Sequence, residues 1–427
     1  MPFPPARPSR RPALVTLVLV GTAASGCVQA DPERPWSTRD RSSETVVAST
    51  PAAPSEAQPV QVAEPIRIAP PPTDRSTTPS TTITRGPQPE RPPAPRTEAA
   101  TEPIDLDGET LWSKAASRVV QSTTNDYSLV RAYAFEAMEH APTLLVEHGG
   151  LGLVDDNRGV RFVTTMAAGR VEAAALMPLL EAGLVDDSES VQAATIFALR
   201  RLGQPVDPSP LAGMARGSDP EVRGNAFMIL GMLGNRSAIP VIESALGRGM
   251  RLENPMRIRI TELQAAESLV MLGDESDVEP IRAALFAPVE QGELTVLACD
   301  MLGRLQDQQA RSMLMRLVLA EGNQMRPAEI RVAAAGAVLR LPEPHEPVLE
   351  DVILEYAASE DPLLRTQVAG ALAHARTERS RAALATLLED PNPIVSTAAA
   401  GSILARPQAG SGTSPERPSS IAVTPSD

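Results

Sequence analysis

A thirteen-residue stretch, residues 222–234, recurs in variant form along most of the chain and constrains its fold more than any other feature. Its apolar residues fall at offsets 0, 4, 8 and 11, which places them on one face of an α-helix. Asp219 and Pro220 precede it as an N-cap and a proline at the first helical position. Gly234 follows, where a helix can end in a left-handed residue. The stretch therefore predicts a short helix with a defined start, buried face and end.

The same helix pattern fits nine places in the sequence, at intervals of 30 to 39 residues. The residue at offset 4 is almost always small and the residue at offset 8 is mostly larger, so neighbouring helices can approach and interlock. The first apolar positions of the nine copies are Val130, Val160, Val191, Val222, Thr261, Leu294, Ile330, Leu364 and Val395.

A second helix is predicted between successive copies, and it begins near a proline, which loses no hydrogen bond in a first helical turn. Examples are Pro178, Pro240, Pro280 and Pro347. Aspartates such as Asp186 and Asp390 occupy the turn between the two helices, where a carboxylate suits the N-terminus of the following helix. Each repeat unit is therefore expected to be a helical hairpin.

The order of a proline-started helix, an aspartate turn and a Val-Arg helix closely resembles the short HEAT repeats of the phycobilisome-lyase-like type. The resemblance covers roughly residues 108–406, and we place the repeat domain at 106–406. It implies an all-α fold, a right-handed α-α superhelix of the HEAT/ARM-like solenoid kind with about nine helical pairs. We expect an extended row on the order of 90 Å long, with Trp112 covering one exposed end.

The first 27 residues have the organisation of an export signal. Arg7, Arg10 and Arg11 come first, then an apolar run too short to span a membrane, then small residues ending at Cys27. The segment 24–27 resembles the bacterial lipobox, although that pattern usually has leucine where Ala24 stands. The resemblance implies lipidation of Cys27 and a membrane-anchored lipoprotein of the cell envelope, facing the periplasm or the outer surface. An ordinary secretory signal, cleaved near Ala23 or Ala30, is the alternative.

Residues 28–105 are rich in proline, serine and threonine and show no sustained helical or strand period. Such a segment cannot bury enough apolar area to offset its ordering entropy, so we expect a disordered tether. An alternative role is a set of proline-rich docking motifs. Residues 407–427 return to this composition and are expected to form a disordered tail.

The charge and the chemistry-bearing residues argue against most catalytic and nucleic-acid functions. The formal net charge is −14, and loss of the three leader arginines would make it −17, which disfavours a nucleic-acid partner. The histidines, His140, His148, His345 and His374, have no metal-ligand spacing, and no phosphate loop or catalytic cysteine setting occurs. Cys299 occupies a core position of its repeat and is expected to be a buried, inert thiol. We therefore predict a protein that is not an enzyme and that uses no cofactor or metal.

Arginine follows the first apolar position in five copies, at Arg131, Arg161, Arg223, Arg331 and Arg365. These arginines either form a ladder of anion contacts or pair with nearby turn aspartates, and the second interpretation is favoured.

The longest insertion between repeats, residues 247–259, is the strongest candidate for a binding site. Its four arginines form a positive region in an acidic protein, and a second insertion at 321–327 adds another arginine at the same kind of turn. Insertions at equivalent turns of a solenoid line one edge, so both would frame one rim. The rim residues are Arg248, Arg251, Arg257, Arg259 and Arg326. The alternative is a solvated loop whose arginines pair with local carboxylates.

These features together predict a non-catalytic, lipid-anchored scaffold that docks a partner protein on its repeat surface. An acidic peptide or an anionic envelope polymer would suit the arginine rim. Two alternatives remain: an enzyme or enzyme accessory related to the bilin lyases that share this repeat type, and a purely structural envelope spacer.

Overall fold

The computed structural model describes residues 110–247, 254–342 and 344–406, and this part of the chain is all-helical. The predicted signal, tether and tail lie outside the described residues. No β-strand occurs in the described ranges. No helix among them is long and apolar enough to cross a bilayer.

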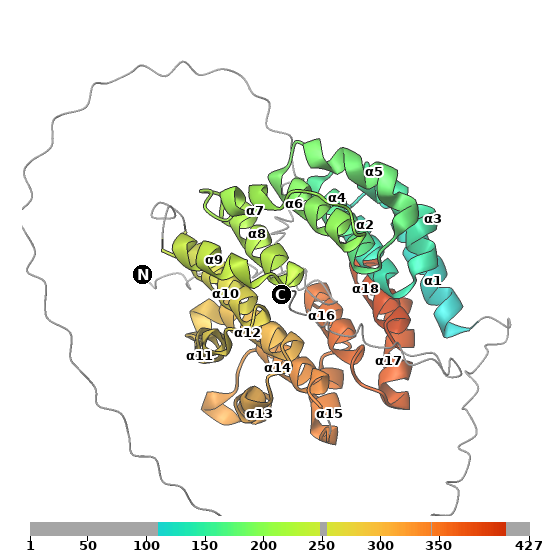
Figure 1. Cartoon of the computed structure of the whole chain (residues 1–427). Helices are drawn as coiled ribbons and strands as arrows, with labels where there is room; N and C mark the ends of the chain where they lie inside the picture. The colour runs from blue at the N-terminus through green and yellow to red at the C-terminus, as the bar shows by residue number, and fades with distance from the viewer. Residues whose placement is uncertain (1–109, 248–253, 343, 407–427) are drawn as a thin grey trace, which may run out of the picture. The chain divides into compact units, whose positions relative to one another are not determined.

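The helices alternate between two layers, which we call inner and outer (Figure 1). The inner helices are α2 (Ser128–Ala137), α4 (Arg158–Arg170), α6 (Glu189–Arg201), α8 (Pro220–Leu233), α10 (Pro255–Met271), α12 (Gly292–Arg304), α14 (Ala328–Arg340), α16 (Pro362–Leu372) and α18 (Pro393–Leu404). The outer helices are α1 (Leu111–Ser122), α3 (Pro142–Leu153), α5 (Met177–Ala182), α7 (Ser209–Met214), α9 (Ile239–Ala245), α11 (Val278–Ala284), α13 (Arg311–Leu319), α15 (Pro347–Glu355) and α17 (Glu378–Leu388).

Helix α8 shows how local sequence sets the ends of these elements. The Asp219 carboxylate accepts hydrogen bonds from the backbone N–H groups of Glu221 and Val222, and Pro220 opens the helix. Gly234 ends it with a φ of 70°, in the left-handed region. The start and end predicted for this stretch are therefore confirmed.

The hydrophobic core fills the contacts between successive inner helices and the contacts between inner and outer helices. Each inner helix packs on the next inner helix in chain order. The small residues at offset 4, such as Ala134, Ala226 and Ala298, are fully buried and let neighbouring backbones approach. Cys299 is a free, fully buried thiol, so its predicted core position is confirmed, and burial raises its pKa.

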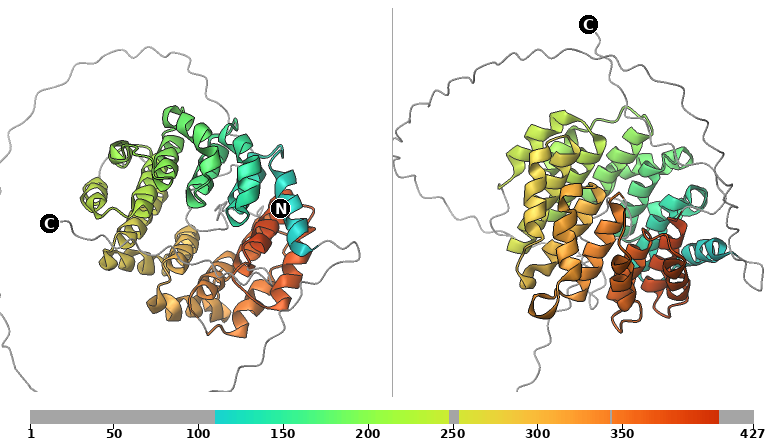
Figure 2. Two further views of the ribbon diagram at one scale, coloured as in Figure 1. Left: turned by 45° about the vertical axis from the view of Figure 1, so that its right-hand side comes forward. Right: turned by 90° about the horizontal axis from the view of Figure 1, so that it is seen from below.

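The row of helices closes into a ring, because its last helices pack against its first. Helix α18 packs against both α1 and α2, as the views in Figure 2 also indicate. Ser122 and Thr397 share a buried hydrogen bond of 2.7 Å across this seam, and Gly401 leaves room for Ala137. The prediction that Trp112 covers an exposed end of the array is therefore wrong, because α1, which carries Trp112, packs against α18. Trp112 packs partly buried against the core.

Arginines after the first apolar position pair with turn aspartates, as the favoured interpretation predicted. Arg131 contacts Asp155 at 2.7 Å, Arg161 contacts Asp186 at 2.8 Å, and Arg365 contacts Asp390 at 2.7 Å. Each of these arginines also donates to backbone carbonyls of the turn before its own helix, so one guanidinium joins two successive turns.

The other two arginines of the set depart from this pattern. Arg331 contacts Glu355 and donates to the Tyr356 hydroxyl. Arg223 is fully buried and donates to the carbonyl oxygens of Arg216, Gly217 and Ala245. Burial lowers the pKa of this guanidinium.

Candidate functional site

The predicted arginine rim is only partly inside the described residues. Arg248 and Arg251 lie outside them. Arg257 and Arg259 are exposed on the first turns of α10, and Arg326 is half-buried just before α14.

Two rim arginines contact the same loop, residues 285–291, which connects α11 to α12. Arg259 donates a hydrogen bond of 2.5 Å to the Gln291 side chain, and Arg326 donates one of 3.1 Å to the Ala287 carbonyl. Arg259 and Arg326, one from each insertion, therefore lie at the same edge of the molecule. Arg326 has a structural role there, and Arg259 is exposed but hydrogen-bonded to Gln291.

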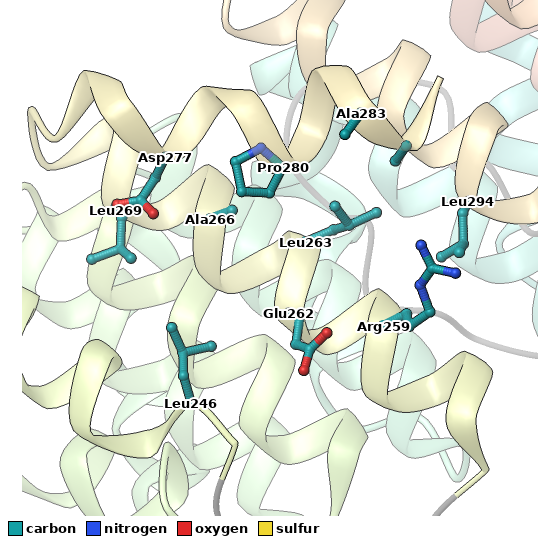
Figure 3. A pocket seen from close by; sticks show the side chains of 11 residues that line it. Leu246, Arg259, Glu262, Leu263, Ala266, Leu269, Asp277, Pro280, Ala283 and Leu294 are labelled. Carbon is teal, nitrogen blue, oxygen red and sulfur yellow. The ribbon is translucent and has the colours of Figure 1, made fainter. Parts of the chain in front are cut away.

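Arg259 also borders a cavity of about 440 Å³ over the outer side of α10 (Figure 3). We call this cavity the α10 groove. Its walls come from the end of α9, from α11 and from the start of α12. The apolar lining consists of Leu246, Leu263, Ala266, Leu269, Pro280, Ala283, Ala284 and Leu294, and the charged lining of Arg259, Glu262 and Asp277. This size and lining are typical of a site for apolar side chains or a small ligand.

The charges of the groove are separated along α10. In Figure 3 the Asp277 carboxylate lies beside Leu269, while the Arg259 guanidinium lies beside Leu294. Burial, together with the charges of Asp274 and Glu243, raises the pKa of Asp277. The carboxylates of Glu262 and Asp277 form no hydrogen bond or ion pair with another described side chain. The groove thus has one acidic end and one basic end.

A second candidate region is a charged cluster at the centre of the ring, where the C-terminal ends of several inner helices meet. Arg304 contacts Glu267 at 2.7 Å and also pairs with Asp300, and Arg340 contacts Asp300 at 2.6 Å. Arg340 also donates to His374 at 3.0 Å, and Arg170 pairs with Glu139. We call these residues, together with Glu136 and His140, the central cluster.

The central cluster joins opposite sides of the ring electrostatically. Burial is the main cause of the raised pKa of Glu136, and the charges of Glu139 and, across the ring, Asp300 add to it. Burial and Arg340 lower the pKa of His374 to about 3, with a further contribution from His140. Both Glu136 carboxyl oxygens are buried without a hydrogen-bond partner among the described residues. His374 is therefore neutral at pH 7, burial favours the protonated form of Glu136, and the other charged groups of the cluster pair with one another.

Sequence reasoning missed the central cluster, although a signal exists. Glu136, Glu267 and Asp300 stand at offset 6 of their repeats, where the other copies have an apolar residue or glycine. Offset 10 holds His140, Arg170, Arg304, Arg340 and His374, and it is also arginine in α6, at Arg201. Polar residues recurring at one repeat position mark a shared face. The cluster offers no metal site, because no group of three or more metal-ligating side chains suited to an ion occurs in the described part of the chain.

No family model matches the chain, and no curated protein matches it. Among solved structures, one engineered protein is 14% identical, with coverage of 68% of this chain and 98% of the other and a TM-score of 0.24. A second engineered protein is 16% identical, with coverage of 63% and 97% and a TM-score of 0.19.

Proposed function

We propose that this protein is a non-catalytic binding scaffold, and that it docks a segment of a partner protein in the α10 groove. The helical body would be a right-handed array of about nine HEAT-type pairs. Cys27 would carry a lipid anchor in the cell envelope, and residues 28–105 would set the reach of the body from the membrane, which raises the local concentration of the partner.

The observation that carries the proposal is the position of Arg259. The sequence places this residue in the longest insertion between repeats, and the structure places it on the lining of a mainly apolar cavity of about 440 Å³. Exposed apolar side chains continue the surface beside the groove, since Phe286 and Val289 are 54% and 55% exposed on the loop that Arg259 contacts. An apolar cavity with a polar border is typical of a peptide-docking surface.

The central cluster supports a structural role in place of catalysis. Its guanidinium groups are engaged by carboxylates, and no nucleophile lies within it: the described cysteine, Cys299, is fully buried. A buried, mutually paired set of charges is costly to break and fixes how the inner helices meet.

Site-specific photocrosslinking in intact host cells tests the proposal. A photoreactive phenylalanine at Ala283, which lines the groove, should give a discrete adduct with one protein. The same residue at Ala382, exposed on α17, is the matched control and should give none. The adduct should sediment with membranes, and Cys27→Ala should release it. No adduct, or the same adducts at both positions, would contradict the proposal.

A further inference from the structure

We infer that the partner segment seated in the α10 groove is an extended apolar peptide with a lysine or arginine at the Asp277 end. This inference rests on the proposed function and specifies the chemistry of its partner. It replaces the acidic peptide that the arginine rim suggested at the sequence level.

The length of the groove favours a short extended segment. Its lining runs along α10 from Arg259 to Leu269, which at 1.5 Å per residue is about 15 Å. An extended peptide covers this distance with about five residues, and alternate side chains of such a peptide point the same way. Two apolar side chains could therefore enter the cavity over Leu263 and Ala266.

The charges of the groove favour a cation on the peptide. Arg259 is already hydrogen-bonded to Gln291, whereas Glu262 and Asp277 form no ion pair with a described side chain. Asp274 and Glu243 act on Asp277 and add negative charge at that end. A cationic side chain beside Asp277 would therefore relieve repulsion between carboxylates as well as form an ion pair, while an acidic one would add to the repulsion.

Fluorescence anisotropy with the full chain and three labelled peptides tests the inference. The first probe is acetyl-Ala-Leu-Ala-Leu-Lys-Gly-amide, the second has glutamate in place of lysine, and the third has serine in place of both leucines. The lysine peptide should bind about tenfold more tightly than the glutamate peptide, and the serine peptide should not bind up to about 1 mM. High salt should reduce the preference for lysine, because the groove is open to solvent.

Two variants connect the preference to the groove. In the double variant Glu262→Gln, Asp277→Asn, the lysine and glutamate peptides should bind within about twofold of each other. The control variant Glu360→Gln removes an exposed carboxylate from the turn before α16 and should keep the tenfold preference.

The possible outcomes separate this inference from the proposed function. Equal or tighter binding of the glutamate peptide, a preference that survives in the double variant, or no binding of the lysine peptide up to about 1 mM overturns the inference. If the Ala283 crosslink is nevertheless specific, the scaffold function stands with a partner of other chemistry. If that crosslink also fails, the groove has no docking role.

Discussion

In two arcs of the ring, the arginine after the first apolar position of the inner helix is paired in different ways. In the arc from α2 to α6, which we call the paired arc, Arg131 and Arg161 bind the aspartates 24 and 25 residues further on. In the arc from α8 to α12, the open arc, the residues 24 and 25 after Arg223 are Gly247 and Arg248.

The change in pairing accompanies a change in packing. In the open arc, Arg223 donates to backbone carbonyls, α10 packs less closely on α12 than on α8, and the outer layer leaves the groove. The comparison indicates that the arginine–aspartate pair holds the outer surface closed, and that an insertion without the aspartate leaves a surface that a partner can use.

The largest expected difference between the arcs is in the stability lost when an arginine is replaced by alanine. Arg161→Ala in the paired arc should lower the free energy of unfolding by about 3 kcal/mol, because it leaves the 13% exposed Asp186 carboxylate without its partner. Arg259→Ala in the open arc should change it by no more than about 0.5 kcal/mol, because that side chain is exposed. Urea unfolding followed by circular dichroism measures both, and equal losses would contradict the distinction.

A smaller difference is expected when a side chain is enlarged. Gly183→Ala would force its new methyl group onto the buried Thr195 hydroxyl in the paired arc, which should cost about 1–3 kcal/mol. Ala283→Leu would extend into the groove and should leave stability within about 0.5 kcal/mol, while weakening binding of the lysine peptide. Thermal unfolding and anisotropy measure the two effects. A destabilising Ala283→Leu would mean that the groove is closed in solution.

The smallest expected difference concerns how an aspartate in each arc makes stability depend on pH: Asp186 and Asp277 should act in opposite directions. Burial would raise the pKa of Asp186, but the hydrogen bonds from Arg161 and the Ser188 N–H, the contact with Asp187 and the charge of Arg161 together outweigh it and lower the pKa. The stabilisation from this carboxylate is therefore present at neutral pH and lost as the pH falls through the folded pKa. Asp277 has a raised pKa, so its folded state favours the protonated form, and stability falls as the pH rises through that pKa.

Asp277→Asn should therefore be slightly more stable than the wild type at pH 7, by a few tenths of a kcal/mol, and equal to it in acid. Asp186→Asn should be less stable than the wild type at pH 7, with a difference that shrinks in acid. Urea midpoints between about pH 3 and 7 test both directions. A loss of stability in Asp277→Asn at pH 7 would show that its carboxylate is paired.

Features encoded within one repeat could be predicted from the sequence. The Asp219 cap, the Gly234 end and the buried offset-4 alanines depend on residues within one helix of each other. The pairing of Arg131, Arg161 and Arg365 with turn aspartates also follows from a fixed spacing. From these local patterns, the helical hairpins and their order along the chain could be predicted.

Features that depend on the whole series could not be predicted in the same way. The meeting of α18 with α1 and α2 depends on the arrangement of all the units between them, which no single repeat specifies. The two sides of the central cluster act on each other only because that closure brings Glu136 within the influence of Asp300. The α10 groove depends on how far apart the outer helices stand, and of its lining only Arg259 was among the predicted site residues.

The seam between α18 and the first two helices has a consequence for how the domain unfolds. In an open repeat array the terminal units have one neighbour and fray first, so unfolding can spread inward from either end. Here the first and last helices pack on each other, so both outermost units have neighbours on two sides. Local opening must break two interfaces at once, and loss of structure should be all-or-none rather than gradual.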